Sequence, residues 1–263
     1  MSDELLTALQ RAFERFAHLA SNVQDPNGPV RGSTWTQGDL VAHVTGGLET
    51  YAGYLNGDEA AVVDVSDIAG GTLTTSNADR LAEEPERTIT VLLDRGAQAL
   101  ATVVEAAAGR SLDEVVAWHG RREPLRCLLA TSLCEQLLHG RDLAGSIQVP
   151  WSISKREAVL VIDNIAPLLP ILVNPHTTRT LVAMMRIVIR DGPTINLAFD
   201  NGTLTVGGDP NRFDATVHAD PLAFLLVAYG RTSQWAQIPR GRLVAWGRRP
   251  WLALRLTSYL VRP

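Results

Sequence analysis

The sequence predicts a helical bundle followed by a small α+β domain. Apolar residues recur at helical spacing in four long segments of the first part, and alternation of apolar and polar residues begins only after Gly145. The segment Val149-Pro150-Trp151 separates the two patterns and is typical of a linker. We therefore expect a four-helix bundle over residues 1–149 and an α+β domain over residues 150–263.

Four segments have the apolar periodicity and the termini of helices. Thr36, followed by Asp39 three residues later, can cap the second helix, and Pro85 and Pro124 suit the first turns of the third and fourth. The stretch 56–84 between the second and third helices is interpreted as a long connection, which a bundle with a crossover requires. The expected helices are residues 5–20, 36–55, 85–109 and 125–145.

The second half has signals of both helices and strands. Ser154 and Glu157 form a capping box, and Asp220 with the proline that follows it opens another helix. Alternating residues on both sides of Asp191-Gly192 predict a hairpin, and Asn201-Gly202 predicts a second turn. The other expected elements are helices at 154–166, 222–229 and 251–260 and a strand at 243–246.

Composition narrows the classes of function. A net charge of -4 provides no basic field to hold a polyanion, so nucleic acid is not an expected partner. The acidic start, Met1 to Glu4, is unlike a secretory signal, and the apolar stretch 158–173 is interrupted by polar residues and prolines, so no membrane partner is expected. We expect a cytoplasmic monomer or homodimer, in which Cys127 and Cys134 are buried thiols.

Three residues form a candidate metal site. Glu135 and His139 are four residues apart and project from one face of a helix, and His43 lies in an earlier helix of similar character. Histidine and carboxylate sets of three ligands with an open fourth position are typical of catalytic zinc. The alternatives are a surface ion pair between Glu135 and His139 and a hydrogen-bonded core histidine at position 43.

Two segments carry a resemblance to a known family. WTQGDLVAH at 35–43 and EQLLHGRDLA at 135–144 resemble the DinB-like mycothiol-dependent maleylpyruvate isomerase family. The resemblance implies a four-helix bundle in which His43, Glu135 and His139 bind a divalent metal, with zinc (Zn2+) as the expected ion. The second half resembles the family's C-terminal domain, which is similar to sterol carrier proteins, at residues 213–217, 220–221, 230–231 and 241–243.

The same resemblance suggests further site residues. The family uses a C-terminal arginine in its active site; Arg231 matches by motif position, with Arg240 and Arg242 as alternatives. Asp142, one turn beyond His139, can orient a ligand or bind substrate, and a helix-end contact is the other interpretation. His119 precedes the fourth helix and can line the same pocket or be a simple loop histidine.

The resemblance implies a metal- and mycothiol-dependent enzyme. A thiolate that adds to a small electrophile gives cis-trans isomerisation if bond rotation and elimination follow, and S-transfer if the adduct stays. Two other functions remain open: a non-catalytic binding protein for an apolar ligand, and a hydrolase that uses metal-bound water. The sequence does not determine the electrophile.

Overall fold

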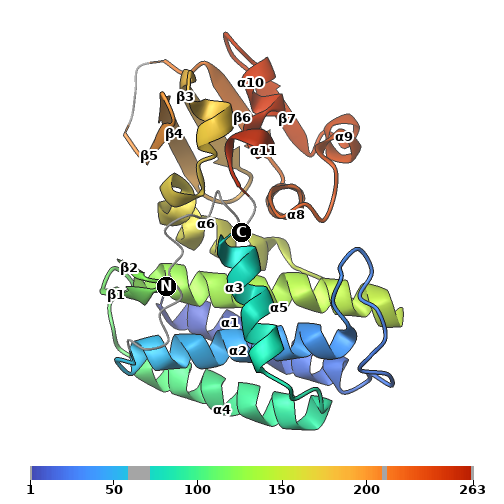
Figure 1. The fold of residues 1–263 in the computed structure, drawn as a ribbon. Helices are drawn as coiled ribbons and strands as arrows, with labels where there is room; N and C mark the ends of the chain where they lie inside the picture. Colours follow the sequence, from blue (N-terminus) through green and yellow to red (C-terminus); the bar gives the residue numbers. More distant parts are fainter. Residues whose placement is uncertain (1, 59–71, 209–211, 262–263) are drawn as a thin grey trace. The chain divides into compact units, whose positions relative to one another are not determined.

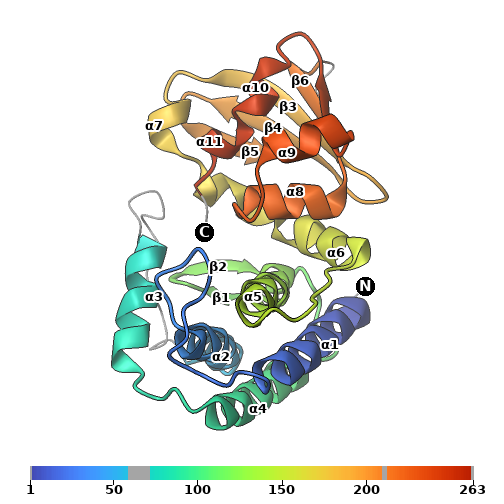
Figure 2. The same ribbon diagram turned by 90° about the vertical axis from the view of Figure 1, so that its right-hand side faces the viewer.

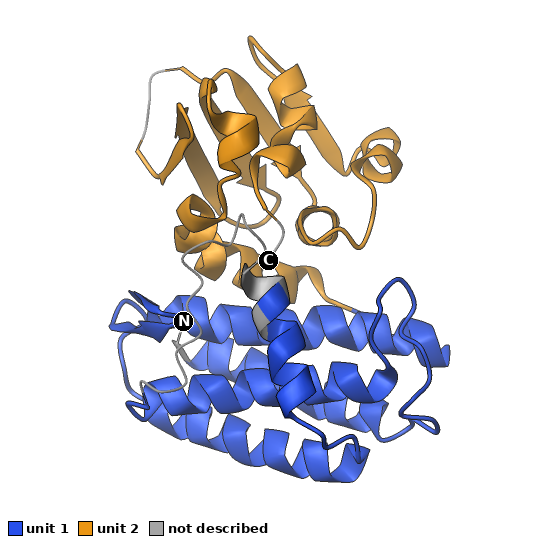
Figure 3. Ribbon diagram, in the orientation of Figure 1, with its two compact units in different colours: residues 1–66, 72–152 blue, residues 67–71, 153–263 orange. Residues whose placement is uncertain are grey.

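The structure is a computed structural model that describes residues 2–58, 72–208 and 212–261. The chain divides into two compact units, with the boundary between Ser152 and Ile153 (Figure 3). The first unit contains described residues 2–58 and 72–152, and the second contains described residues 153–208 and 212–261. Each unit is described by itself.

The first unit is the helical bundle that the sequence predicts. Helix α2 packs against α4 and α5, and α1 packs against α5 (Figures 1 and 2). The apolar faces of these helices meet in a shared core that includes Phe16, Leu40, Leu92 and Leu143. The long helices are α1 (Ser2–Ala20), α2 (Gln37–Leu55), α4 (Ile89–Ala107) and α5 (Leu125–Ile147).

The start of α2 is fixed by the predicted cap. Thr36 Oγ1 accepts a hydrogen bond of 3.1 Å from the Asp39 backbone N–H, and Asp39 Oδ2 accepts one of 2.9 Å from the Thr36 N–H. This reciprocal pair satisfies two amide groups that the first turn of a helix leaves free. The cap therefore sets the register of the helix that carries His43.

The segment between α2 and α4 differs from the predicted connection. Residues 59–71 of the expected connection lie outside the described residues, and α3 (Thr72–Glu83) is helical. The next helix begins at Ile89 and not at Pro85. Glu86 Oε1 accepts hydrogen bonds from the N–H groups of Arg87 and Thr88, at 2.9 and 2.6 Å, and so holds the backbone in a turn in place of a first helical turn.

A short hairpin precedes α5 and was not predicted. Strand β1 (Val115–Trp118) pairs antiparallel with β2 (Arg121–Pro124), and His119 and Gly120 form the turn with φ values of 45° and 77°. Two central residues with positive φ match the two-residue turn that suits a twisted hairpin. His119 is therefore a turn residue, held in a left-handed conformation.

The second unit is built around a five-stranded sheet with the order β5-β4-β3-β6-β7. The predicted hairpin is confirmed: β3 and β4 pair antiparallel across the turn at Asp191 and Gly192. Strand β6 lies parallel to β3, and the other neighbours are antiparallel. The strands are β3 (Val182–Ile189), β4 (Thr194–Asp200), β5 (Thr203–Val206), β6 (Ala215–Ala219) and β7 (Leu243–Trp246).

The helices of the second unit are mostly as predicted. Ser154 and Glu157 form the capping box of α6, and Asp220 caps α8 by accepting a hydrogen bond from Ala223 N–H. The expected C-terminal helix is instead two short helices, because Arg255, with φ -101° and ψ -2°, interrupts it. The helical bounds are α6 (Lys155–Ile165), η2 (Ala166–Leu172), α7 (Pro175–Thr178), α8 (Pro221–Ala228), α9 (Gln234–Gln237), η3 (Ile238–Arg240), α10 (Trp251–Leu254) and α11 (Leu256–Tyr259).

Two expectations from composition can be checked in the described residues. Cys127 and Cys134 are buried free thiols, as predicted. None of the helices in the described segments combines the length and apolar character needed to cross a bilayer.

Candidate metal centre

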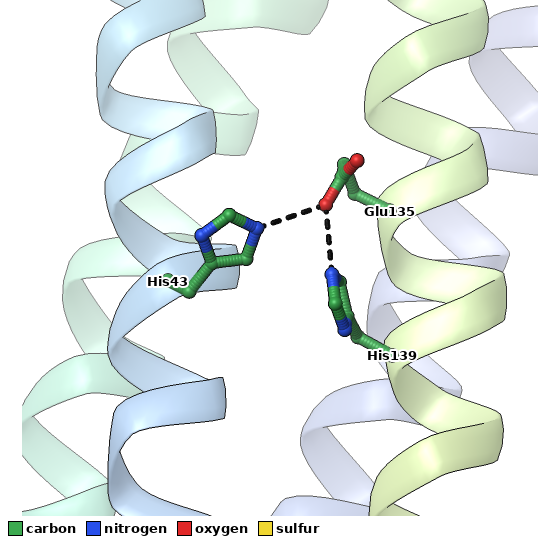
Figure 4. Close-up of side chains that lie close together, drawn as sticks. All are labelled: His43, Glu135 and His139. Carbon is green, nitrogen blue, oxygen red and sulfur yellow. Dashed lines mark hydrogen bonds and ion pairs between the residues drawn. The ribbon is translucent and has the colours of Figure 1, made fainter. Parts of the chain in front are cut away.

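Helices α2 and α5 bring the three candidate ligands together. His43 Nε2 and His139 Nε2 each lie 3.0 Å from Glu135 Oε2, and the three ligand atoms are within 4.8 Å of one another. Figure 4 shows both imidazole rings directed at the same carboxylate oxygen. Because α2 packs against α5, residues 92 positions apart in sequence meet at one point inside the bundle.

The cluster is largely withdrawn from solvent. The side chains of His43 and His139 are 8% and 12% exposed, and that of Glu135 is 31% exposed. Trp35 packs on the two imidazoles, with ring centroids 4.7 Å from His43 and 5.8 Å from His139. Low exposure strengthens each electrostatic interaction in the cluster.

Burial and charge move the three pKa values apart. Burial, aided by the charges of His139 and Arg80, lowers the pKa of His43 to about 4 against the opposing effect of Glu135. Burial also opposes protonation of His139, but the carboxylates of Asp142 and Glu135 outweigh it and raise the pKa of His139 to about 9. Burial acts to raise the pKa of Glu135, yet the two histidines hold it well below its usual value. The carboxylates of Asp142 and Glu135 therefore favour the charged form of His139, whereas burial favours the neutral form of His43.

The Nδ1 atoms of the two imidazoles, which point away from Glu135, face different partners. His139 Nδ1 lies 3.6 Å from Asp142 Oδ2, on the same helix. His43 Nδ1 lies 3.1 Å from Arg80 Nη2, which comes from α3. A carboxylate behind a histidine is the usual partner of a metal ligand, whereas a guanidinium is not.

The donor set fits a divalent metal. In a tetrahedral zinc site, bonds of about 2.0–2.2 Å place neighbouring ligand atoms roughly 3.3 Å apart, close to the two 3.0 Å separations found here. His139 Nδ1 is buried without a hydrogen bond in the described structure, and a metal on Nε2 would place a proton there, facing Asp142. Asp142 therefore lies next to Nδ1 of His139, and its role in orienting a ligand or binding substrate stays a prediction.

His119 contacts aromatic side chains of the first unit, and none of its described contacts is with the three candidate ligands. Its Nε2 is 3.4 Å from the Tyr51 hydroxyl oxygen, and its ring also packs on Trp118 and Tyr54. Burial, together with the charge of Arg80, lowers the pKa of His119 to about 4, while Glu135 opposes the shift. His119 is therefore a neutral imidazole in an aromatic cluster, close enough to feel the charges of the site.

The candidate arginines belong to the second unit. Arg231 follows α8, and its Nη1 donates a hydrogen bond of 2.9 Å to the Tyr229 carbonyl. Arg240 Nη1 donates to the Ala236 carbonyl, and Arg242 Nη1 donates to Gln237 Oε1 at 3.3 Å. Their assignment to the active site remains a prediction from the family resemblance.

Two residues beside the histidines were not predicted as site residues. Trp35 belongs to the motif around His43, but its ring packing depends on the loop that precedes α2. Arg80 lies in the stretch interpreted as a connection, and no spacing in the sequence links it to His43. Helical periodicity between residues 72 and 83 was the one available signal.

The fold and the site together define a helical bundle with a His-Glu-His cluster, joined to an α+β unit. The profile of the mycothiol maleylpyruvate isomerase N-terminal domain matches residues 6–144, and the chain belongs to this family of enzymes. Among curated proteins, no sequence matches the chain.

Two solved structures of one enzyme show the same fold. The crystal structure of the mycothiol-dependent maleylpyruvate isomerase is 15% identical, covers 93% of this chain and 92% of that chain, and superposes with a TM-score of 0.54. A single-site mutant of that enzyme has the same identity and coverage and a TM-score of 0.55. The sterol carrier protein 2 like 2 from Aedes aegypti matches 41% of this chain and 100% of its own, with 16% identity and a TM-score of 0.32.

Proposed function

We propose that the protein is a mycothiol-dependent enzyme that isomerises a small unsaturated carboxylate, with a divalent metal held by His43, Glu135 and His139. The observation that carries the proposal is the meeting of both Nε2 atoms on one Glu135 oxygen in a chain of this family. Two imidazoles and a carboxylate favour zinc among the common ions and leave a coordination position open.

A divalent metal, when bound, lowers the pKa of a coordinated thiol and so supplies a thiolate at neutral pH. The side chains around the proposed metal position suit the formation of a thiolate. Glu135 is ionised and carries the negative charge of the ligand set, and His43 is neutral because of its burial. Asp142 orients His139, and Trp35 shields both rings from water.

The reaction itself is an addition followed by an elimination. The sulfur of mycothiol forms a C–S bond to one carbon of the substrate double bond, and the electron pair moves onto the conjugated carbonyl. Rotation about the resulting single bond, followed by cleavage of the C–S bond, gives the trans isomer and returns the thiolate. S-transfer is the outcome if the adduct is protonated and released instead.

Metal content and thiol dependence test the proposal. Purified protein should contain about one zinc per chain, and His43→Ala and His139→Ala should each lose it. His18→Ala is a matched control, because His18 is an exposed histidine of the same unit. Folding of each variant is checked by circular dichroism. Folded His43→Ala and His139→Ala proteins with full zinc content would show that the ligand set is wrong.

Turnover is measured with an electrophile panel in the presence of mycothiol, of glutathione, or of no thiol. Activity should require the thiol, and Glu135→Gln should abolish it through loss of the metal. Undiminished turnover without thiol would favour metal-dependent hydrolysis. Arg231→Ala should keep the metal and slow the turnover of carboxylate substrates if Arg231 binds the carboxylate.

A cavity in the second unit favours a second candidate function, the binding of an apolar ligand. The cavity has a volume of about 590 Å³ and lies among α6, η2, α8, α10 and the sheet. Its walls are mostly apolar and include Ile165, Leu169, Phe224, Leu225, Trp251 and Leu260. A cavity of this size and character suits an apolar small molecule. Displacement of a fluorescent fatty-acid probe from the full chain tests it, and Phe224→Asp should abolish probe binding.

A further inference from the structure

Arg80 differs from Arg87 and Arg95 of the first unit because its partners are neutral. Its Nη2 lies 3.1 Å from His43 Nδ1 and 3.2 Å from Asn77 Oδ1, and its Nη1 lies 3.5 Å from Thr50 Oγ1. Among the residues that the structure describes, no carboxylate is within ion-pair distance of it. A guanidinium is always charged, so within the described residues this half-buried cation has no anionic partner.

Neighbouring arginines show the contrast. Arg87 pairs with Asp39 at 2.7 Å, and Arg95 pairs with Glu49 at 2.8 Å and Glu84 at 2.6 Å. These two arginines tie segments of the bundle together through charge-assisted bonds. Arg80 has no comparable structural partner, although it is the arginine that reaches the candidate metal ligands.

The contact between Arg80 and His43 is incompatible with a metal on His43. Arg80 donates to His43 Nδ1, so the ring proton resides on Nε2, from which it is donated to Glu135. A metal ligand must use the free electron pair of Nε2, which places the proton of a neutral imidazole on Nδ1. Two donors would then face each other across 3.1 Å. The metal-bound state therefore requires Arg80 to move away.

We infer that Arg80 leaves His43 when the metal binds and then binds the carboxylate of the substrate. The inference rests on the proposed function and names the group in the first unit that recognises an anionic electrophile. The guanidinium offers its fork to a carboxylate in a bidentate manner, and it lies only one imidazole ring away from the ligand atoms. Asn77 and Thr50, which now accept from Arg80, keep its side chain beside the site.

The first test measures zinc affinity without any substrate, by competition with a chromophoric chelator. Arg80→Ala should bind zinc about 3- to 10-fold more tightly than wild type, because it removes a donor and a positive charge that disfavour the metal-bound state. Arg110→Ala is the matched control, since Arg110 of the same unit pairs with Glu114 and should leave the affinity unchanged. Weaker zinc binding by a folded Arg80→Ala protein would overturn the inference. If Arg80→Ala does not fold, Arg80→Met, which keeps the length of the side chain, replaces it.

The second test uses maleate as a carboxylate probe with zinc-loaded protein in calorimetric titrations. Arg80→Ala should weaken maleate binding at least 10-fold, and Arg80→Lys should restore part of it. In turnover assays, KM for a carboxylate electrophile should rise while that for its neutral methyl ester stays unchanged. If zinc-loaded Arg80→Ala binds maleate as tightly as wild type, the carboxylate-binding role of Arg80 is wrong, and the proposed function is unaffected. A wild-type protein that retains no zinc would overturn the proposed function, and the inference with it.

Discussion

Gly140, directly after His139 in α5, should not tolerate a methyl group. A Cβ at this position would lie 2.6 Å from Trp151 Cε2 and 2.7 Å from Trp151 Cη2, well inside van der Waals contact. The indole cannot easily retreat, because its Nε1 donates a 3.0 Å hydrogen bond to the Leu137 carbonyl and Arg15 lies 5.1 Å from the ring centroid. Gly140→Ala is therefore expected to destabilise the first unit.

The size of the effect follows from three contributions. Replacing glycine by alanine inside a helix ordinarily stabilises by about 1 kcal/mol. Overpacking against the indole costs about 1–3 kcal/mol, and loss of the indole hydrogen bond costs about 1 kcal/mol more. The free energy of unfolding should thus fall by about 1–3 kcal/mol.

Chemical denaturation of the variants measures this prediction. Gly145→Ala is the matched control, because a Cβ at Gly145 of the same helix meets nothing within 4 Å, and it should be neutral or stabilising by up to about 1 kcal/mol. In a Trp151→Ala background, the sign of Gly140→Ala should reverse to stabilising. A Gly140→Ala protein as stable as Gly145→Ala would refute the steric argument.

Three further predictions concern pH and stability. In metal-free protein, the raised pKa of His139, about 9, contributes stability that is fully present below about pH 6.5 and is lost as the pH rises through 9, so the Tm should fall across this range in wild type and fall less in His139→Gln. Asp214 accepts hydrogen bonds from Met184 N–H at 3.0 Å and from Arg249 at 2.7 Å, which hold its pKa well below the usual value. Asp214→Asn should therefore destabilise the second unit by about 1–3 kcal/mol in denaturation experiments, and unchanged stability would contradict this. Thr36→Ala removes the cap of α2 and should cost about 1 kcal/mol, whereas Thr102→Ala, at a half-buried position inside α4 with no capping role, should cost less than about 0.5 kcal/mol.

Local sequence signals predicted most of the elements because their causes are local. The caps at Thr36, Ser154 and Asp220 use side chains within three residues of the amides they bind, and the Asp191-Gly192 turn fixes its own hairpin. The errors occurred where another local interaction competed. Glu86 binds the amides that the expected helix start needed, and the His119-Gly120 turn has positive φ values that histidine rarely adopts.

The sequence by itself determined that Glu135 and His139 share a helix face, because a helix repeats every 3.6 residues. It proposed His43 as the third member from its place in a second apolar helix and from the family resemblance, but the meeting of the three residues depends on the packing of α2 against α5 across 92 residues. The tertiary structure alone decided which group stands behind the imidazole of His43. Asp142 lies behind His139 through the helix repeat, whereas Arg80 reaches His43 from α3, at a position that no periodicity connects to it. The physical reason is that contacts within a helix follow from backbone geometry, while contacts between helices follow from how their side chains pack.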